Sequence, residues 1–258
     1  MPLRSKTSFA LIAALLCAHV ASAADITVLV SGAFAEALTE LGPQFERATK
    51  HKLLTVDGAS MGGAPDSIPS RLSRGEPADI VILAAAALDD LIKNGQVRPG
   101  SRADLVRSSI GMVVRAGAKH PDISSVDALK RTLLAAKSIA YSASASGVYL
   151  STDLFPSLGI ADQVKAKSKR IESERVASVV ARGEAEIGFQ QISELLPVKG
   201  VDYVGPLPPG AQRVTVFSAG IAVKSKNPDA ARALIQFLTS PSAAPVIAKT
   251  GLDPIPPR

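Results

Sequence analysis

Cysteine is almost absent from this 258-residue sequence, and its single copy, Cys17, lies near the N-terminus. The chain beyond it has no residue for a disulfide, a cysteine nucleophile or a zinc–thiolate site. Tryptophan is absent and tyrosine occurs three times, so we do not expect a ligand to be recognised by aromatic stacking. His51 and His120 are isolated and lack metal-ligand spacing. We therefore expect neither a metal nor a cofactor.

Long apolar runs are also missing, with one exception near the N-terminus. Residues 9–20 are apolar but too few to cross a bilayer. Arg4 and Lys6 precede this run and the small residues 21–23 follow it, an order typical of a secretory signal peptide. We predict that residues 1–23 are a cleaved signal peptide and that the mature protein acts in the periplasm.

Neither sign of charge dominates the sequence. The 29 Lys and Arg side chains exceed the 23 Asp and Glu side chains, for a formal net charge of +6. A modest positive excess fits a small anionic ligand. No dense block of Lys and Arg with interleaved aromatic residues occurs, so we expect no nucleic-acid partner.

Familiar catalytic motifs are absent or incomplete. Gly58, Ser60 and Gly62 match the G-x-S-x-G spacing of a nucleophile elbow, but such a hydrolase needs a histidine later in the chain. Only His120 follows Ser60, and the second half of the chain contains no histidine. No G-x-x-x-x-G-K-[ST] motif for phosphate binding occurs either. We therefore set serine hydrolysis and P-loop chemistry aside.

The stretch that organises the chain is residues 25–50. Residues 26–30 are apolar and mostly β-branched, as in a strand buried on both faces of a parallel sheet. Ser31 and Gly32 end this run, and an apolar stripe from Phe34 to Phe45 predicts an amphipathic helix. The first N–H groups of such a helix can bind an anion. Proline at position 43 leaves the helix intact, kinked or split.

Strand and helix patterns then alternate, which predicts an α/β fold. We expect lobe I to contain residues 24–106 plus 213–258 and lobe II to contain residues 107–212. Ligands of such folds bind beside the carboxyl ends of strands, here in a cleft between the lobes. Strands are predicted at 53–56, 78–83, 108–115, 138–141, 185–190, 201–204 and 213–223, and further helices at 64–74, 86–94, 126–136, 148–158, 161–166, 174–182, 228–239 and 243–250.

The whole chain beyond residue 23 resembles periplasmic solute-binding proteins of the molybdate-binding family. That resemblance implies the type II periplasmic-binding-protein fold, with mixed sheets flanked by helices and a cleft between two lobes. It also implies a monomer that delivers a small anion to an inner-membrane ABC permease. The motifs that carry the resemblance are Gly58-Ala59-Ser60, RGEPADIVILAA at 74–85, ARGEAEIGF at 181–189, Ser193-Glu194-Leu195 and NPDAARALIQFLTSP…GLDPI at 227–255.

The resemblance also implies where the ligand binds. The family's serine after the first strand falls on Ala33, its second serine is kept as Ser60, and its tyrosine is replaced by Gln191. The turn at 142–147 exposes backbone N–H groups, and Arg175 could hold a carboxylate with two hydrogen bonds. We predict the following ligand-binding residues: Ser31, Gly32, Ala33, Ser60, Met61, Ser144, Ser146, Gly147, Tyr149, Arg175 and Gln191.

The replacements favour a ligand larger than a tetrahedral oxyanion. A glutamine offers both a donor and an acceptor, so an organic polycarboxylate captured for ABC-type uptake is our first hypothesis. The pattern is also similar to that of aconitate isomerases, which would need a base and donors to a carboxylate. Ser31, Ser60, Tyr149 or a cleft carboxylate could take part, and the sequence does not name the base. Capture of molybdate or tungstate is the third hypothesis.

Overall fold

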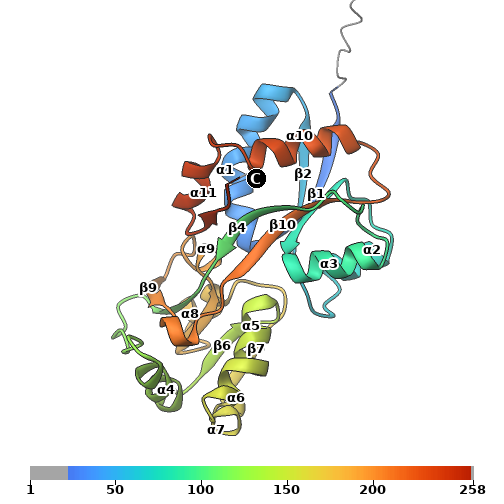
Figure 1. The fold of residues 1–258 in the computed structure, drawn as a ribbon. Coiled ribbons are helices and arrows are strands. Elements are labelled where there is room, and N and C mark those ends of the chain that lie inside the picture. The colour runs from blue at the N-terminus through green and yellow to red at the C-terminus, as the bar shows by residue number, and fades with distance from the viewer. Residues whose placement is uncertain (1–22, 257–258) are drawn as a thin grey trace, which may run out of the picture.

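The computed structural model describes residues 23–256 and contains two β-sheets with helices packed against them (Figure 1). The mixed α/β class predicted from the sequence is confirmed. Apart from Ala23, the predicted signal peptide lies outside the described residues. None of the helices within 23–256 is long and apolar enough to cross a membrane.

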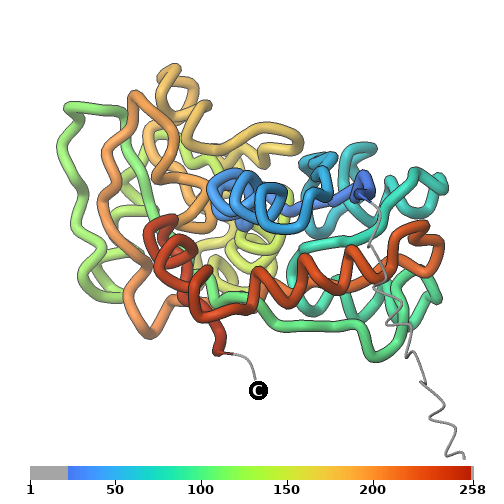
Figure 2. Tube along the Cα trace, turned by 90° about the horizontal axis from the view of Figure 1, so that it is seen from above, coloured from blue at the N-terminus to red at the C-terminus, as the bar shows by residue number. Residues whose placement is uncertain are grey.

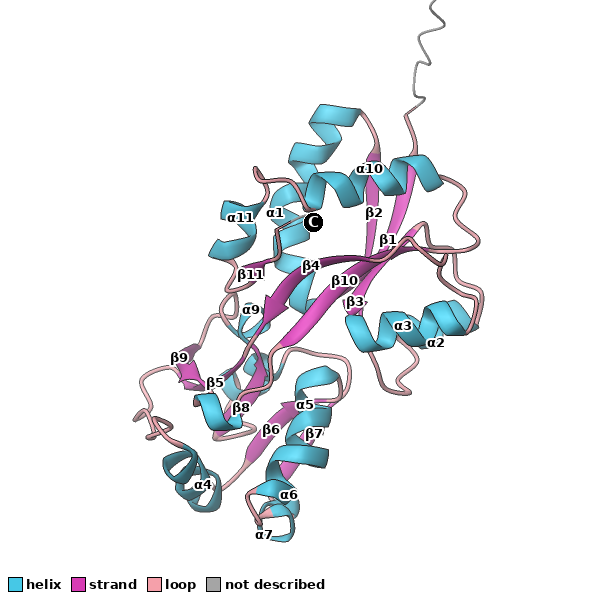
Figure 3. Ribbon diagram, in the orientation of Figure 1, coloured by secondary structure: helices cyan, strands magenta, loops and turns pink. Residues whose placement is uncertain are grey.

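The first sheet has six strands in the order β11-β4-β10-β3-β1-β2 (Figure 3). Strand β1 pairs in parallel with β2 and β3, whereas β10 runs antiparallel to β3 and β4. The side chains of β1 alternate between two apolar clusters, so the predicted burial of this strand on both faces is confirmed. The strands are β1 (Asp25–Ser31), β2 (Lys52–Gly58), β3 (Ile80–Ala84), β4 (Ala103–Ser108), β10 (Thr215–Ile221) and β11 (Asp253–Pro254).

The second sheet has five strands in the order β7-β6-β8-β5-β9. Here β6 pairs in parallel with β7 and β8, and β5 runs antiparallel to β8 and β9. We propose that each sheet with its helices forms one of the two lobes. The strands are β5 (Ile110–Arg115), β6 (Ile139–Ser142), β7 (Ser168–Ile171), β8 (Ile187–Gln191) and β9 (Val201–Pro206).

Helices cover both sheets. Figure 2 shows α1 and α10 side by side, and Phe45 of α1 packs against Phe237 of α10 with ring centroids 5.6 Å apart. On the first sheet lie α1 (Gly32–Thr49), α2 (Ile68–Ser73), α3 (Ala85–Lys93), α10 (Pro228–Leu238) and α11 (Ala244–Lys249). The others are α4 (Val126–Ala135), α5 (Ala145–Tyr149), the π-helix η1 (Leu150–Leu154), α6 (Phe155–Ser157), α7 (Ala161–Lys165), α8 (Val176–Ala181), α9 (Ile192–Leu195) and the 3₁₀ helix η2 (Pro209–Ala211).

Two segments of the chain connect the sheets, and the second contains η2. One passes from β4 through Ser109 into β5, and the other leaves β9 and enters β10. The Gln212 amide joins them, because its Oε1 accepts from the Ile110 N–H at 2.8 Å and its Nε2 donates to the Ile110 carbonyl at 2.9 Å. The short helix α9 adds a further link, where the Ser193 hydroxyl donates to the Ala33 carbonyl of α1 at 2.8 Å.

Several element boundaries differ from the sequence prediction. The single strand predicted at 108–115 is two strands, because β4 ends at Ser108 in the first sheet and β5 begins at Ile110 in the second. Strand β7 was not predicted, since its sequence SKRI has exposed polar residues. Helix α1 continues through Pro43, so the helix is intact. The helix predicted from residue 148 begins earlier, at Ala145.

Candidate functional site

A cavity of about 230 Å³ lies between the two sheets. Its walls come from the carboxyl ends of β1 and β2 in the first sheet and of β6, β7 and β8 in the second. This is where ligands bind in open α/β sheets. The cavity is therefore the candidate ligand site of the molecule.

Three helices begin at the wall of the cavity. Ser31, Ser144 and Arg175 are the residues that precede α1, α5 and α8, and all three line the cavity. None of these side chains caps its own helix. The first N–H groups of a helix lack partners within the helix and carry partial positive charge. The helix ends therefore favour an anionic group in the cavity.

Glu194 is the most perturbed acid at this site. Its side chain is half-buried and lines the cavity, and Gln190 Nε2 donates to its Oε1 at 2.8 Å. Burial raises the pKa of the Glu194 carboxyl to about 7, and Asp57 contributes to the rise. Arg175 and the Gln190 hydrogen bond act against it. A carboxyl with this pKa can take up and release a proton near neutral pH.

Glu194 also lies against the start of α1. A Cβ atom added to Gly32 would overlap Glu194 Oε1, so an alanine there would require the Glu194 side chain to move. Glycine therefore permits the close contact between these two residues. It brings the carboxyl of α9 and the uncapped first turn of α1 to the same wall of the cavity.

Arg175 supplies the positive charge at the cavity. Its guanidinium lies 3.8 Å from the Glu36 carboxylate of α1, and both side chains keep about a third of their surface exposed. A contact of this length and exposure is weak. The guanidinium is therefore available to a carboxylate ligand, to which it can donate two hydrogen bonds.

The rim of the cavity carries two glutamates that are already paired. Glu172 pairs with Arg170 at 3.1 Å, and Glu174 pairs with Arg182 at 2.9 Å. Because both carboxylates lie against an arginine, the rim repels an anion less than the number of its acids suggests.

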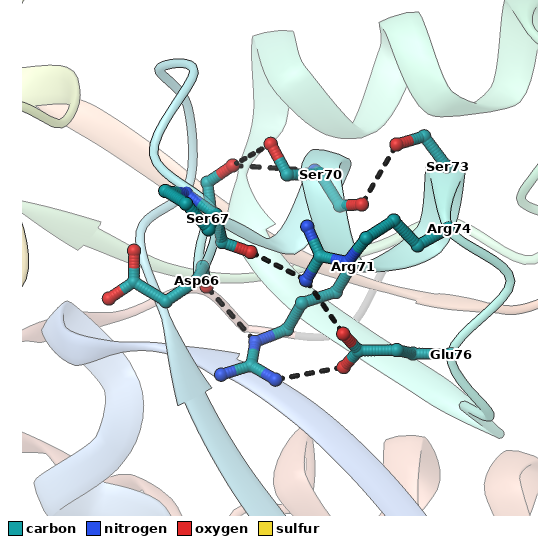
Figure 4. A network of polar contacts seen from close by, with 8 residues as sticks. Asp66, Ser67, Ser70, Arg71, Ser73, Arg74 and Glu76 are labelled. Carbon is teal, nitrogen blue, oxygen red and sulfur yellow. Dashed lines mark hydrogen bonds and ion pairs between the residues drawn. The ribbon is translucent and has the colours of Figure 1, made fainter.

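Asp66 is a further acid at the cavity. Figure 4 shows its carboxylate pointing away from the network formed by Arg71, Arg74 and Glu76. That network holds the segment in place, since Arg71 donates to the Asp66 carbonyl at 3.1 Å. Asp66 lines the cavity, and its buried Oδ1 has no hydrogen-bond partner among residues 23–256. It can accept a hydrogen bond from a hydroxyl or an acid proton of a ligand.

Four of the residues predicted from the sequence line this cavity: Ser31, Gly32, Ser144 and Arg175. Others lie beside it and serve the fold. Ser60 is buried, its hydroxyl accepts from the Ala84 N–H at 3.0 Å, and its own N–H donates to Ser144 Oγ at 3.2 Å. The Ser60 hydroxyl oxygen is thus bonded to a backbone N–H, and Ser60 is not among the residues that line the cavity.

The remaining predicted residues are also held by protein contacts. Ala33 is buried and accepts from Ser193. Ser146 is buried against Ser142 Oγ at 3.0 Å, and at Gly147 a Cβ atom would overlap the Ser142 carbonyl.

Gln191 lies at the segments that connect the sheets. Its Oε1 accepts from the Ser108 hydroxyl at 2.8 Å, and its Nε2 lies 3.4 Å from Thr215 Oγ1. Met61 and Tyr149 line a different hollow of about 290 Å³, described here as the groove. The structure thus divides the predicted set between the cavity, the connecting segments and the groove.

Sequence reasoning did not identify Glu194, Gln190, Asp57 or Asp66 as site residues. Asp57 and Gln190 could have been predicted, because both are polar residues at the carboxyl ends of strands, where ligands bind in open α/β sheets. Glu194 was harder to predict, since it reaches the cavity only through the packing of the four-residue helix α9 on α1. No group of three or more His, Cys, Asp or Glu side chains within 23–256 is placed to hold a metal ion.

Solved structures place the fold in a class. The periplasmic molybdate-binding protein of Azotobacter vinelandii superposes with a TM-score of 0.70 at 21% identity, covering 90% of this chain and 100% of that one. The sulfate-binding protein SubI of Mycobacterium tuberculosis superposes with a TM-score of 0.71 at 18% identity, covering 91% and 88%. The architecture is that of a periplasmic binding protein.

Sequence relatives define the family. The family profile described as bacterial extracellular solute-binding protein matches residues 26–253, and this chain belongs to that family. An aconitate isomerase from Pseudomonas sp is 50% identical over 231 residues, covering 90% of this chain and 88% of the relative. The molybdate-binding protein ModA of Azotobacter vinelandii is 30% identical over 247 residues, covering 92% of each. The predicted family is confirmed.

Proposed function

We propose that this protein is a periplasmic aconitate isomerase in which Glu194 is the catalytic base. The observation that carries the proposal is a half-buried carboxyl with a pKa of about 7 in a cavity that is bordered by Arg175 and by the first turns of helices. The 50% identity to a protein named aconitate isomerase supports the same reaction.

The substrate has three carboxylates on a three-carbon chain with one double bond. Arg175 would hold one carboxylate, and the first turn of α1 would hold another. This arrangement would place the acidic methylene of the substrate near Glu194. The third carboxylate would share a proton with the unpartnered Asp66 Oδ1, because two ionised carboxylates in contact repel each other.

The reaction needs one proton transfer and its return. Ionised Glu194 removes a proton from the methylene carbon, and the C–H electron pair spreads over the three carbons and the adjoining carboxylate. The N–H groups at the start of α1 stabilise the charge that builds up there. Glu194 then returns the proton to the other terminal carbon, so the double bond moves and its geometry can change. Atoms and electrons balance without a co-reactant.

Capture of a polycarboxylate or of molybdate for ABC-type uptake is the competing function, and the 30% identity to a molybdate-binding protein favours it. Proton NMR of the mature protein with cis-aconitate separates the two. We expect the trans isomer to appear. Binding without interconversion would indicate a transport receptor for the acid. Stabilisation by molybdate alone would exclude both carboxylate functions.

A further inference from the structure

Two adjacent glutamines at the end of β8 have different surroundings. Gln190 faces the cavity and contacts Glu194, whereas Gln191 contacts Ser108 at the connecting segments. Both side chains are buried, with 4% and 2% of their surface exposed. Successive residues of a strand point to opposite faces, which explains the difference.

The orientation of the Gln190 amide is determined by its second partner. Its Oε1 accepts from the Val176 N–H at 2.8 Å, in a buried contact. A backbone N–H can only donate, so the amide oxygen must face Val176 and the NH₂ group must face Glu194. Glu194 Oε1, 2.8 Å away, therefore has to be the acceptor. This assignment follows from the hydrogen-bond network, which is the only means of distinguishing the two ends of an amide.

The two oxygens of Glu194 are consequently unequal. Oε1 is enclosed between the Gln190 amide and the start of α1 at Gly32. Oε2 accepts no hydrogen bond from any of the residues 23–256. A proton on Oε1 would compete with the NH₂ donor for the space between the two side chains, whereas a proton on Oε2 meets no such donor.

We infer that Gln190 is a positioning residue that reserves Oε2 of Glu194 for the moving proton. This inference rests on the proposed isomerase function. By holding Oε1, Gln190 keeps the carboxyl in one orientation, so the same oxygen removes the proton from one terminal carbon and returns it to the other. The amide also stabilises the ionised base between these two steps, because it donates to the carboxylate.

The test compares two neighbouring substitutions of equal size. Gln190→Glu keeps an acceptor for the Val176 N–H, so the fold retains that contact, but it places a carboxylate where the donor was. Gln191→Glu makes the same change one residue later and keeps an acceptor for Ser108. The pH dependence of kcat and the ¹³C NMR titration of the Glu194 carboxyl carbon are measured for the parent and both variants.

For Gln190→Glu, we expect both midpoints to move to higher pH by roughly one unit or more, because two adjoining carboxyls share a proton. At pH 7 a one-unit move lowers the ionised fraction, and with it kcat, about fivefold. KM is expected to change little. For Gln191→Glu, both midpoints are expected to stay where they are in the parent.

Each result decides one question. If Gln190→Glu keeps the parent midpoints, or if Gln191→Glu moves them equally, the positioning role is wrong while the isomerase function stands. If the parent protein does not interconvert the aconitates, the proposed function fails and the inference fails with it.

Discussion

The cavity and the groove lie between the same two sheets yet differ in how their polar groups are satisfied. In the groove, the Tyr149 hydroxyl donates to the Ala211 carbonyl at 3.1 Å, and Arg213 stacks on the Tyr149 ring while it pairs with Asp153 at 3.5 Å. In the cavity, Asp66 Oδ1 has no partner and Glu194 bears a strongly shifted pKa. Polar groups that are hydrogen-bonded inside the protein stabilise the fold, whereas a buried polar group without a partner and a strongly shifted pKa indicate a candidate ligand site.

The boundary between the two hollows is narrow. Ala59 and Ser144 line the cavity, and their neighbours Met61 and Ala145 line the groove. The hydrogen bond between the Ser60 N–H and Ser144 Oγ crosses from one sheet to the other at this point. Small differences in side-chain direction thus decide whether a residue faces the cavity or the groove.

The largest effect is expected from Glu194→Gln. Loss of the base should reduce the interconversion of aconitates by about 10²–10⁴-fold, because an amide cannot take up the proton. Binding should persist, since a neutral side chain repels carboxylates less. Kinetic assays and calorimetric titration with trans-aconitate measure the two properties. Glu172→Gln, at the rim, is the matched control, and an equal loss of rate there would contradict the assignment of the base.

The same substitution should also change the pH dependence of stability. The pKa of Glu194 is raised from 4.5 to about 7 in the folded protein, so between these pH values the folded chain retains a proton that the unfolded chain has lost. Stability should therefore decrease as the pH rises through this interval. Glu194→Gln should increase the free energy of unfolding at pH 8 by up to about 3 kcal/mol. Denaturant titrations of parent and variant should converge near pH 4, and parallel curves throughout would refute the shift.

Arg175 and Arg213 offer a direct comparison of the cavity with the groove. Arg175→Met should weaken aconitate binding by about 1.5–3 kcal/mol, the usual contribution of a hydrogen bond to a charged group. Arg213→Met removes a similar side chain from the groove and should leave the dissociation constant unchanged. Isothermal titration of both variants at one ionic strength measures this. If the Arg213 variant loses the affinity, the ligand lies in the groove.

Ser60→Ala tests the boundary between the two hollows. The substitution leaves the Ala84 N–H without its acceptor in a buried position, which should lower the free energy of unfolding by about 1–3 kcal/mol. The affinity for aconitate should change little, because the hydroxyl faces the backbone. Chemical denaturation and ligand titration distinguish these effects, and a loss of affinity at unchanged stability would place Ser60 in the ligand site.

The sequence predicted the strands better than it predicted the use of each side chain. Continuous apolar, β-branched runs such as those of β1 and β3 suit strands that are buried on both faces of a sheet, so their place in the fold could be predicted from the sequence pattern. A serine or a glutamine can bind a ligand or the backbone equally well. Ser60 and Gln191 proved to bind protein groups, and only the tertiary contacts distinguish the two uses.

Glu194 is a candidate site residue that the sequence did not predict. Its Ser-Glu-Leu segment is one of the motifs that carry the family resemblance and predicts no ligand contact, and its helix is four residues long. The carboxyl gains its unusual pKa from burial beside α1, a segment 160 residues earlier in the chain. Such proximity follows from packing and has no local sequence pattern.

The clamp formed by Gln212 has a mechanical consequence. Its amide bonds both the N–H and the carbonyl of Ile110, and the Leu207 N–H donates to the same carbonyl, so the two segments that connect the sheets are tied to each other where they cross. The two crossings would therefore act as one joint and not as two independent linkers. Any movement of one sheet relative to the other would have to carry both segments together.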